Sequence, residues 1–421
     1  MQIIHKTENG TIVQGDNIEV MEKVKENTVD SCISDFPYNL SFMGKKWDTS
    51  ENFYDWCYKR ASGLHRIMKP GGYVCIFGHP KTNHRMKSAF EDVGFKIVEE
   101  IDWVYLTGLP KNQDIGKLFD KKAGKKRPLS NRQRPIGGRR GVYEGQGGNW
   151  GETENIPQTE ESKIWDGWKT AGLKPAHEPI TIFQKPLEGT YIQNIKKYGC
   201  GGMNIDACRV PINPEIDDPR LGGKGDWSTK KAAENIYEGG YAGERVSSSE
   251  LGRFPANIIF NSSMGEILDE QSGFLKSGSV NPDGYKGEYT ANVYGKYANN
   301  QIDPKTVYAD SGGASRYFLK INAEDFVPFL YCPKPTKKEK GKGNTHVTVK
   351  PKELIKWLIK LVTPVGGRTI DITAGSGTHG LSCEELNRDE NYNLHWLNIE
   401  MLNTEKEPYC EIAKNRIRNV I

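Results

Sequence analysis

Short buried-strand patterns alternate with helical patterns at both ends of the chain. Residues 31–34 and 72–78 form apolar runs, and the second is bounded by glycines, which is typical of parallel strands covered on both faces. Between them, residues 54–69 show helical spacing of apolar positions and stop at Pro70. A broad apolar helical face over 352–362 then precedes a strand that begins at Thr369. This alternation predicts one doubly wound, mostly parallel α/β sheet.

The middle of the chain lacks this periodicity. Residues 111–150 are rich in Gly, Pro, Arg and Lys, and 213–297 are rich in Gly and Ser. A long irregular insert in an α/β protein is more often a binding element than a second core. We therefore predict three parts: the N-terminal part of the sheet domain (1–105), an insert that contributes strands at about 177–186 and 254–260 (106–330), and the C-terminal part of the sheet domain (331–421).

Composition excludes several classes of protein. The 421 residues carry 58 Lys and Arg against 54 Asp and Glu, a formal net charge of +4. No apolar run reaches the roughly 18 residues of a membrane span, and the N-terminal segment lacks the apolar core of a signal peptide, so we expect a cytoplasmic protein without membrane contact. Cys200 and Cys208 lack a second pair of ligands at a usual spacing, so no metal site is predicted.

The small net charge conceals two basic segments. Residues 106–150 hold 11 basic against 3 acidic side chains, and 331–360 hold nine lysines against two glutamates. Such segments favour a polyanionic partner, because neutralising phosphates releases counterions; solvated loops are the alternative. The candidate contacts in the first segment are Lys121, Lys122, Lys125, Lys126, Arg127, Arg132, Arg134, Arg139 and Arg140.

A glycine-rich turn follows the C-terminal strand. Residues 371–380 read Asp-Ile-Thr-Ala-Gly-Ser-Gly-Thr-His-Gly and lead into a helical pattern. Glycines at such a turn let a ligand approach the backbone, and the helix amides suit a polar group. The next strand ends in Glu400, about 25 residues beyond Gly375, where a carboxylate can bond ribose hydroxyls. A purely structural turn is the alternative, but the combination favours a nucleoside cofactor.

A second motif, Asp35-Phe36-Pro37-Tyr38-Asn39, follows the first buried strand. An acid, a proline-held turn and an aromatic ring at the end of a parallel strand suit a small planar ligand. Asp35 can accept one hydrogen of an exocyclic amine, the Phe36 carbonyl can accept the other, and Tyr38 can stack on the ring. A turn with a packed aromatic is the alternative.

The two motifs together resemble those of the DNA amino-methyltransferases, whose signature is Asp-Pro-Pro-Tyr with an S-adenosylmethionine loop. The motif order, with the Asp-Phe-Pro-Tyr element N-terminal, is that of the β class of this family. Further landmarks are similar, namely Gly15-Asp16-Asn17, residues 69–72, 177–180, 252–257, 315–318 and 346–351. The resemblance implies a Rossmann-like methyltransferase sheet whose large insert recognises the target.

The resemblance also implies residue roles. Asp35, the Phe36 carbonyl, Pro37 and Tyr38 would hold a flipped base, with Asn39 beside them and Asp16 near the same pocket. The expected cofactor-binding residues are Asp371, Thr373, Gly375, Ser376, Gly377 and Glu400, together with Thr348 and Lys350, which would close over S-adenosylmethionine.

The implied reaction is attack of an exocyclic amine of double-stranded DNA on the sulfonium methyl. Asp at the first motif position favours adenine N6, and cytosine N4 is the alternative. Methylation at cytosine C5 would need a Pro-Cys nucleophile, which the sequence lacks. Phe36 and Thr373 depart from the family pattern, so a catalytically impaired DNA-binding relative is a second alternative, and an enzyme acting on RNA or free nucleosides is a third. A restriction-modification setting and a homodimer are both compatible with the sequence.

Overall fold

The structure is a computed structural model. It describes residues 1–40, 48–105, 112–127, 156–170, 172–210, 252–273, 275–276, 311–321, 349–405 and 407–420. The chain forms two compact units, a large one of Met1–Leu106 with His177–Ile421 and a small one of Thr107–Ala176.

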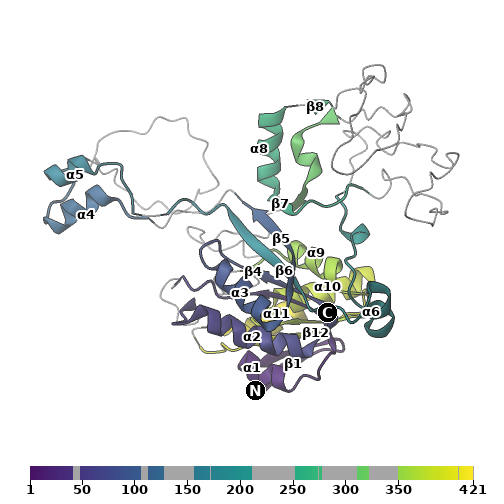
Figure 1. The fold of residues 1–421 in the computed structure, drawn as a ribbon. Helices are drawn as coiled ribbons and strands as arrows, with labels where there is room; N and C mark the ends of the chain where they lie inside the picture. Colours follow the sequence, from purple (N-terminus) through teal and green to yellow (C-terminus); the bar gives the residue numbers. More distant parts are fainter. Residues whose placement is uncertain are drawn as a thin grey trace, which may run out of the picture. The chain divides into compact units, whose positions relative to one another are not determined.

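A ten-stranded sheet forms the centre of the large unit (Figure 1). Neighbouring strands are parallel from β2 to β4 and again from β5 through β7 to β10, while β1 and β6 run antiparallel to their neighbours. In spatial order the strands are β1 (Gln2–Lys6), β2 (Gly10–Gln14), β12 (His395–Glu400), β11 (Arg368–Asp371), β3 (Val29–Asp35), β4 (Met68–Phe77), β6 (His177–Gln184), β5 (Lys96–Val104), β7 (Ile258–Asn261) and β10 (Leu319–Ile321). This arrangement confirms the predicted doubly wound α/β fold.

Successive side chains of a strand point to opposite faces of the sheet, and here both faces carry apolar side chains. Helices therefore cover both faces. Cys32, Val74 and Ile76 pack on the side of α2 (Phe53–Ile67) and α3 (Asn83–Val93). Ile33, Cys75 and Phe77 belong to the core on the side of α9 (Lys352–Val362) and α10 (Thr378–Glu390). The remaining elements that the structure describes in this unit are α1 (Asn17–Glu22), α6 (Tyr191–Tyr198), α8 (Ser262–Ser272), α11 (Tyr409–Arg418), the short helices η3 (Asp206–Cys208) and η7 (Ala314–Tyr317), and the strand pair β8 (Leu275–Lys276) and β9 (Ser311–Gly312).

One boundary differs from the sequence prediction. The helical pattern predicted to reach Lys69 ends at Ile67, and β4 begins at Met68 although Pro70 follows two residues later. The register of β4 against β3 shifts between Val29 and Ser31, so β4 carries extra residues at this point. Such an irregularity accommodates a proline that cannot donate to the ladder. None of the helices in the described ranges is long and apolar enough to span a membrane.

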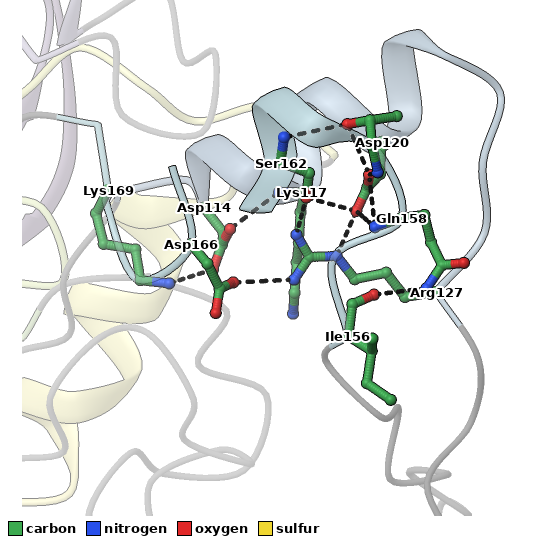
Figure 2. Close-up of polar contacts among 10 residues, drawn as sticks. Asp114, Lys117, Asp120, Arg127, Ile156, Gln158, Ser162, Asp166 and Lys169 are labelled. Carbon is green, nitrogen blue, oxygen red and sulfur yellow. Dashed lines mark hydrogen bonds and ion pairs between the residues drawn. The ribbon is translucent and has the colours of Figure 1, made fainter. Parts of the chain in front are cut away.

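In the part of the small unit that the structure describes, α4 (Ile115–Lys122) and α5 (Glu160–Ile164) meet around an ion pair between Asp120 of α4 and Arg127, which lies beyond the end of α4 (Figure 2). Asp120 Oδ2 accepts from Arg127 Nε at 2.6 Å and from Ser162 Oγ at 2.8 Å. Burial alone would raise the pKa of Asp120, but these hydrogen bonds hold it well below its usual range. Arg127 also donates to Ser162 and its side chain is only 6% exposed, so it is a structural residue and not the exposed DNA contact that we predicted.

A chain of polar side chains crosses the core of the large unit beneath the glycine-rich turn. Ser31 Oγ donates to Thr369 Oγ1, which lies 2.9 Å from His379 Nε2, and His379 Nδ1 lies 2.8 Å from Asn398 Oδ1. Asn398 Oδ1 can only accept, so the imidazole donates from Nδ1 and accepts from Thr369 as a neutral ring. Burial lowers the pKa of His379 to about 4.

This network predicts a pH-dependent term in stability. Between pH 6.5 and 4 the unfolded chain protonates this histidine and the folded chain does not, so the stability that His379 contributes is lost as pH falls through this window. The difference in free energy of unfolding between wild type and His379→Gln should shrink by about 3 kcal/mol from pH 7 to pH 4. Urea denaturation at both pH values measures it, and a pH-independent difference would contradict the assignment.

Candidate active site

Four carboxylates converge on one edge of the sheet. Asp35 ends β3, Asp371 ends β11, and Glu400 ends β12. Glu178 lies near the start of β6, and because β6 is antiparallel to β4, its start lies at the same edge as the ends of the parallel strands. The chain leaves β3 toward β4 on one side and reaches β11 and β12 on the other, so the edge beside β3 and β11 is the topological switch point where α/β sheets bind ligands.

Lys350 joins the Asp-Phe-Pro-Tyr turn to β6. Its Nζ lies 2.9 Å from Asp35 Oδ2 and 3.1 Å from Glu178 Oε2. It also donates to Tyr38 Oη at 2.9 Å, and Tyr38 Oη in turn donates to Glu178 Oε2 at 3.0 Å. We expected Lys350 to close over the cofactor; the structure instead places its ammonium among the side chains expected to hold the target base. Thr348, its expected companion, lies outside the described residues.

Burial is the largest single influence on the pKa values of Asp35, Tyr38 and Lys350. It raises the pKa of Asp35, with the charge of Lys350 offsetting part of the effect. The pKa of Tyr38 is raised well above its usual value by burial and by the nearby Asp35 and Glu178 carboxylates. Burial would lower the pKa of Lys350, but its two carboxylate partners outweigh that effect and raise it. Lys350 is therefore a firmly charged ammonium inside the site.

The two motifs are connected by hydrogen bonds between hydroxyls and backbone. Thr373 Oγ1 donates to the carbonyl of Asp35 at 2.9 Å and lies 2.8 Å from Ser34 Oγ. Ser34 Oγ donates to Asp371 Oδ1 at 2.6 Å. Burial raises the pKa of Asp371 to about 7, and the Asp35 and Glu400 carboxylates add to the shift. Thr373, which departs from the family pattern, thus ties the turn after β11 to the turn after β3.

The glycine-rich turn is held from two directions. Gly375 N donates to Glu400 Oε2 at 2.7 Å, while Leu402 N donates to Glu400 Oε1 at 2.8 Å. Gly377 has φ +76°, and a Cβ there would lie 2.6 Å from Ala413 Cβ on α11, so only glycine fits. Arg416 Nη1 donates to both the carbonyl and the hydroxyl of Ser376, each at 2.8 Å.

Phe36 and Asn39 support the turn that carries Asp35. Phe36 is 2% exposed and meets the Trp56 ring edge-on at 5.2 Å, so packing supplies the rigidity that a proline would give. Asn39 adopts a left-handed backbone with φ 54°, and its Oδ1 accepts from Ser50 N at 2.6 Å. Its amide side chain therefore holds the local fold, whereas we had expected it beside the target base. Pro37 lies between them, half-buried.

Asp16 and Asn17 follow β2, which lies on the β12 side of the switch point, whereas β4 lies on the opposite side. Asp16 caps α1 through Ile18 N at 2.8 Å, just after β2, and the preceding Gly15 N donates to the carbonyl of Glu400. This position places Asp16 next to the end of β12, on the Glu400 side of the switch point and not on the Glu178 side. Asn17 Nδ2 donates to the carbonyl of Ile372, and within the described ranges its buried Oδ1 has no hydrogen-bond partner.

The candidate polyanion contacts divide into three groups. Lys121, Lys122, Lys125 and Lys126 are exposed on the small unit, and Arg127 is the buried partner of Asp120. Arg132, Arg134, Arg139 and Arg140 lie outside the described residues, as does most of the second basic segment.

Sequence reasoning missed two residues of this site. Glu178 was visible only as part of a similar His-Glu-Pro-Ile segment, and its place depends on the antiparallel direction of β6. Arg416 sits in the last turn of α11, where a basic residue is ordinary, and its contact with Ser376 spans 40 residues. No local pattern marks either role.

A doubly wound sheet with a glycine-rich turn and an Asp-Phe-Pro-Tyr turn side by side at its switch point defines the Rossmann-like methyltransferase class. The chain belongs to the DNA methylase family of N6 and N4 methyltransferases, whose model matches residues 29–415. S-adenosylmethionine is the methyl donor of this family.

Individual relatives are distant. Type II methyltransferase M.HindIII of Haemophilus influenzae is 23% identical over 232 residues, which is 46% of this chain and 64% of the relative. M.BamHI of Bacillus amyloliquefaciens is 33% identical over 81 residues, which is 18% of this chain and 19% of the relative. This chain thus matches less than two thirds of the length of either. The cytosine-N4-specific PvuII DNA methyltransferase structure covers 98% of this chain and 94% of its own, with a TM-score of 0.41 and 13% identity.

The contact between Arg416 and Ser376 predicts an indirect effect on cofactor affinity. Replacing Arg416 with Met removes charge-assisted hydrogen bonds that hold the turn, each of which contributes on the order of 1.5–3 kcal/mol. Calorimetric titration should show S-adenosylmethionine binding weakened by about 10-fold or more. Arg418→Met, an exposed residue on the same helix, is the control. Equal affinity in both variants would show that this contact does not shape the turn.

Proposed function

We propose that this chain is a site-specific DNA methyltransferase that transfers a methyl group from S-adenosylmethionine to an exocyclic amine of a flipped base, with adenine N6 as the favoured target. One observation supports it most directly. Asp35 keeps one carboxylate oxygen engaged with Lys350, while its buried Oδ1 has no hydrogen-bond partner in the part of the chain that the structure describes. An amine N–H is the donor that satisfies such an atom.

The residues at the switch point fit the cofactor that the family uses. Asp371 would face its amino group, Glu400 its ribose hydroxyls, and the turn from Gly375 to Gly377 its methionine part. Burial raises the cost of ionising both Asp371 and Glu400, and the Glu400 carboxylate adds to that cost at Asp371; a cationic ligand relieves it. When bound, S-adenosylmethionine supplies an electrophilic methyl group.

The residues of the chain act on the amine. Its lone pair is delocalised into the base, so the amine must be held and aligned before it can attack. Asp35 Oδ1 accepts one amine hydrogen and then its proton, the Phe36 carbonyl accepts the other hydrogen, and the Tyr38 ring stacks on the base. Alignment of this kind contributes a large share of rate acceleration. Extruding the base from a duplex costs a few kcal/mol, which stacking and contacts of the insert to phosphates offset.

The surroundings of Phe36 and Thr373 favour an active enzyme over a catalytically impaired relative. Phe36 and Thr373, the departures that suggest an impaired relative, are both accommodated, one by packing and the other by hydrogen bonds to the Asp35 turn. Adenine is favoured over cytosine only by the aspartate at the first motif position. Exposed lysines of the small unit favour a polymer over a free nucleoside. By analogy with relatives named type II methyltransferases, we extend the proposal to a restriction-modification setting.

Expression in a host that lacks DNA methylation of its own tests the proposal. Genome sequencing with modified-base detection should find N6-methyladenine at one short recognition sequence. Asp35→Ala should reduce the methylated fraction, and the purified variant should transfer methyl groups about 100-fold or more slowly, because the amine is no longer held. Glu91→Ala, an exposed carboxylate on α3, is the matched control. N4-methylcytosine would change only the target base, whereas no amine methylation by wild type would contradict the function.

A further inference from the structure

Lys350 makes three contacts with the target-base side of the site. A lysine ammonium has three donors, and here Asp35 Oδ2, Glu178 Oε2 and Tyr38 Oη lie 2.9, 3.1 and 2.9 Å from Nζ. The Lys350 side chain is only 8% exposed, so solvent does not screen these contacts as it would on the surface. All three partners are residues that surround the expected position of the amine, and none of them belongs to the glycine-rich turn.

The contact with Asp35 determines which of its oxygens is available. A free carboxylate can rotate and present either oxygen, but Oδ2 is held by the ammonium and the backbone of Asp35 is held by Thr373. Oδ1 is therefore left, buried and without a hydrogen-bond partner within the described ranges. Asymmetric engagement of this kind orients the accepting lone pairs before the amine arrives.

Glu178 completes the arrangement from the neighbouring side of the sheet. It balances the ammonium of Lys350 and accepts the Tyr38 hydroxyl, while Thr82 Oγ1 donates to the Tyr38 carbonyl at 2.9 Å. The Tyr38 ring is thus held at both its hydroxyl and its backbone. With two carboxylates and one ammonium, the cluster keeps a net negative charge that can receive the proton released from the methylated amine.

We propose that Lys350 and Glu178 are positioning residues of the methyl-transfer step. Lys350 holds one oxygen of Asp35 so that the other faces the target amine, and Glu178 holds Lys350 and the Tyr38 hydroxyl. The proposal rests on the proposed function and assigns Lys350 to the base side of the site, against a role in binding the cofactor. In the step itself the amine nitrogen forms the new N–C bond, the methyl–sulfur bond breaks, and one amine proton passes to Asp35 Oδ1.

The first experiment separates cofactor binding from methyl transfer in Lys350→Met, Lys350→Arg and Glu178→Gln. Calorimetry should give S-adenosylmethionine affinities within about threefold of wild type, whereas single-turnover transfer to DNA at saturating cofactor should fall about 100-fold in Lys350→Met. Lys350→Arg, which keeps the charge, should recover part of that rate, and Glu178→Gln should lie between them. Lys352→Met is the matched control, because Lys352 pairs with Glu385 outside this cluster.

A second experiment does not depend on activity. With ¹³C-labelled aspartate and Asp35→Asn to assign the signal, NMR titration follows the Asp35 carboxyl, which faces Lys350, Glu178, Tyr38 and Asp371. Losing the ammonium should raise the pKa of Asp35 in Lys350→Met relative to wild type, while Lys352→Met should leave it unchanged.

The outcomes separate this inference from the proposed function. If wild type methylates DNA but Lys350→Met loses only cofactor affinity and keeps its single-turnover rate, Lys350 binds the cofactor and the inference is wrong. If wild type methylates no DNA, the proposed function fails, and the positioning role of Lys350 fails with it. The titration then still decides whether the ion pair exists, and an unchanged Asp35 pKa in Lys350→Met overturns the inference by itself.

Discussion

The burial of negative charge at one edge of a parallel sheet is the constraint on which this site depends. Asp35, Asp371 and Glu400 end neighbouring strands, and Glu178 joins them because β6 runs the other way. Burial raises the pKa of the first three, so each is costly to keep ionised. On the β3 side the ammonium of Lys350 offsets that cost. Around Asp371 and Glu400, backbone and hydroxyl donors offset only part of it, which leaves a place for a cation.

The two sides of the site differ in charge, and this difference matches the ligands that we propose for them, a base on the Lys350 side and the cofactor on the Asp371 side. The Lys350 side is neutralised internally except for one oxygen of Asp35, which suits a neutral base that brings a hydrogen-bond donor. The Asp371 side lacks such an internal ammonium among the partners described above, which suits a ligand that carries its own positive charge. Thr373 connects the two halves, because its hydroxyl donates to the Asp35 carbonyl and its backbone N–H donates to Asp371 Oδ1. The amine and the methyl donor would therefore be held by one continuous hydrogen-bonded unit.

Much of the fold followed from the sequence, because strand and helix periods are strong at both ends. The helix predicted over 352–362 has those bounds in the structure, and the strands ending at Asp35, Asp371 and Glu400 lie where the motifs required. Local sequence patterns were less informative where contacts with a neighbouring strand determine the bounds of an element. β4 begins before Pro70 because an irregular register beside β3 accepts the proline.

The site was predictable as a set of motifs but not as a set of contacts. Lys350 was a candidate cofactor contact in the sequence, whereas the structure places it beside Asp35 and Glu178. These partners depend on β6, whose direction no periodicity reveals. Arg127 looked like one more member of a basic run, and only the fold of the small unit shows that it is the buried partner of Asp120. Both cases have the same physical origin: a long cationic side chain is assigned its role by the carboxylate that the fold brings to it.

If the Asp371 side of the edge binds a cation, binding of the cofactor should release protons from the protein. Because burial raises the pKa of Asp371 to about 7, roughly half of this carboxyl is protonated at pH 7 in the free protein. Calorimetry of S-adenosylmethionine binding in buffers of different ionisation enthalpy should show release of about half a proton, and Asp371→Asn should abolish that release. Proton uptake, or the same proton balance in wild type and Asp371→Asn, would show that Asp371 does not face a bound cation.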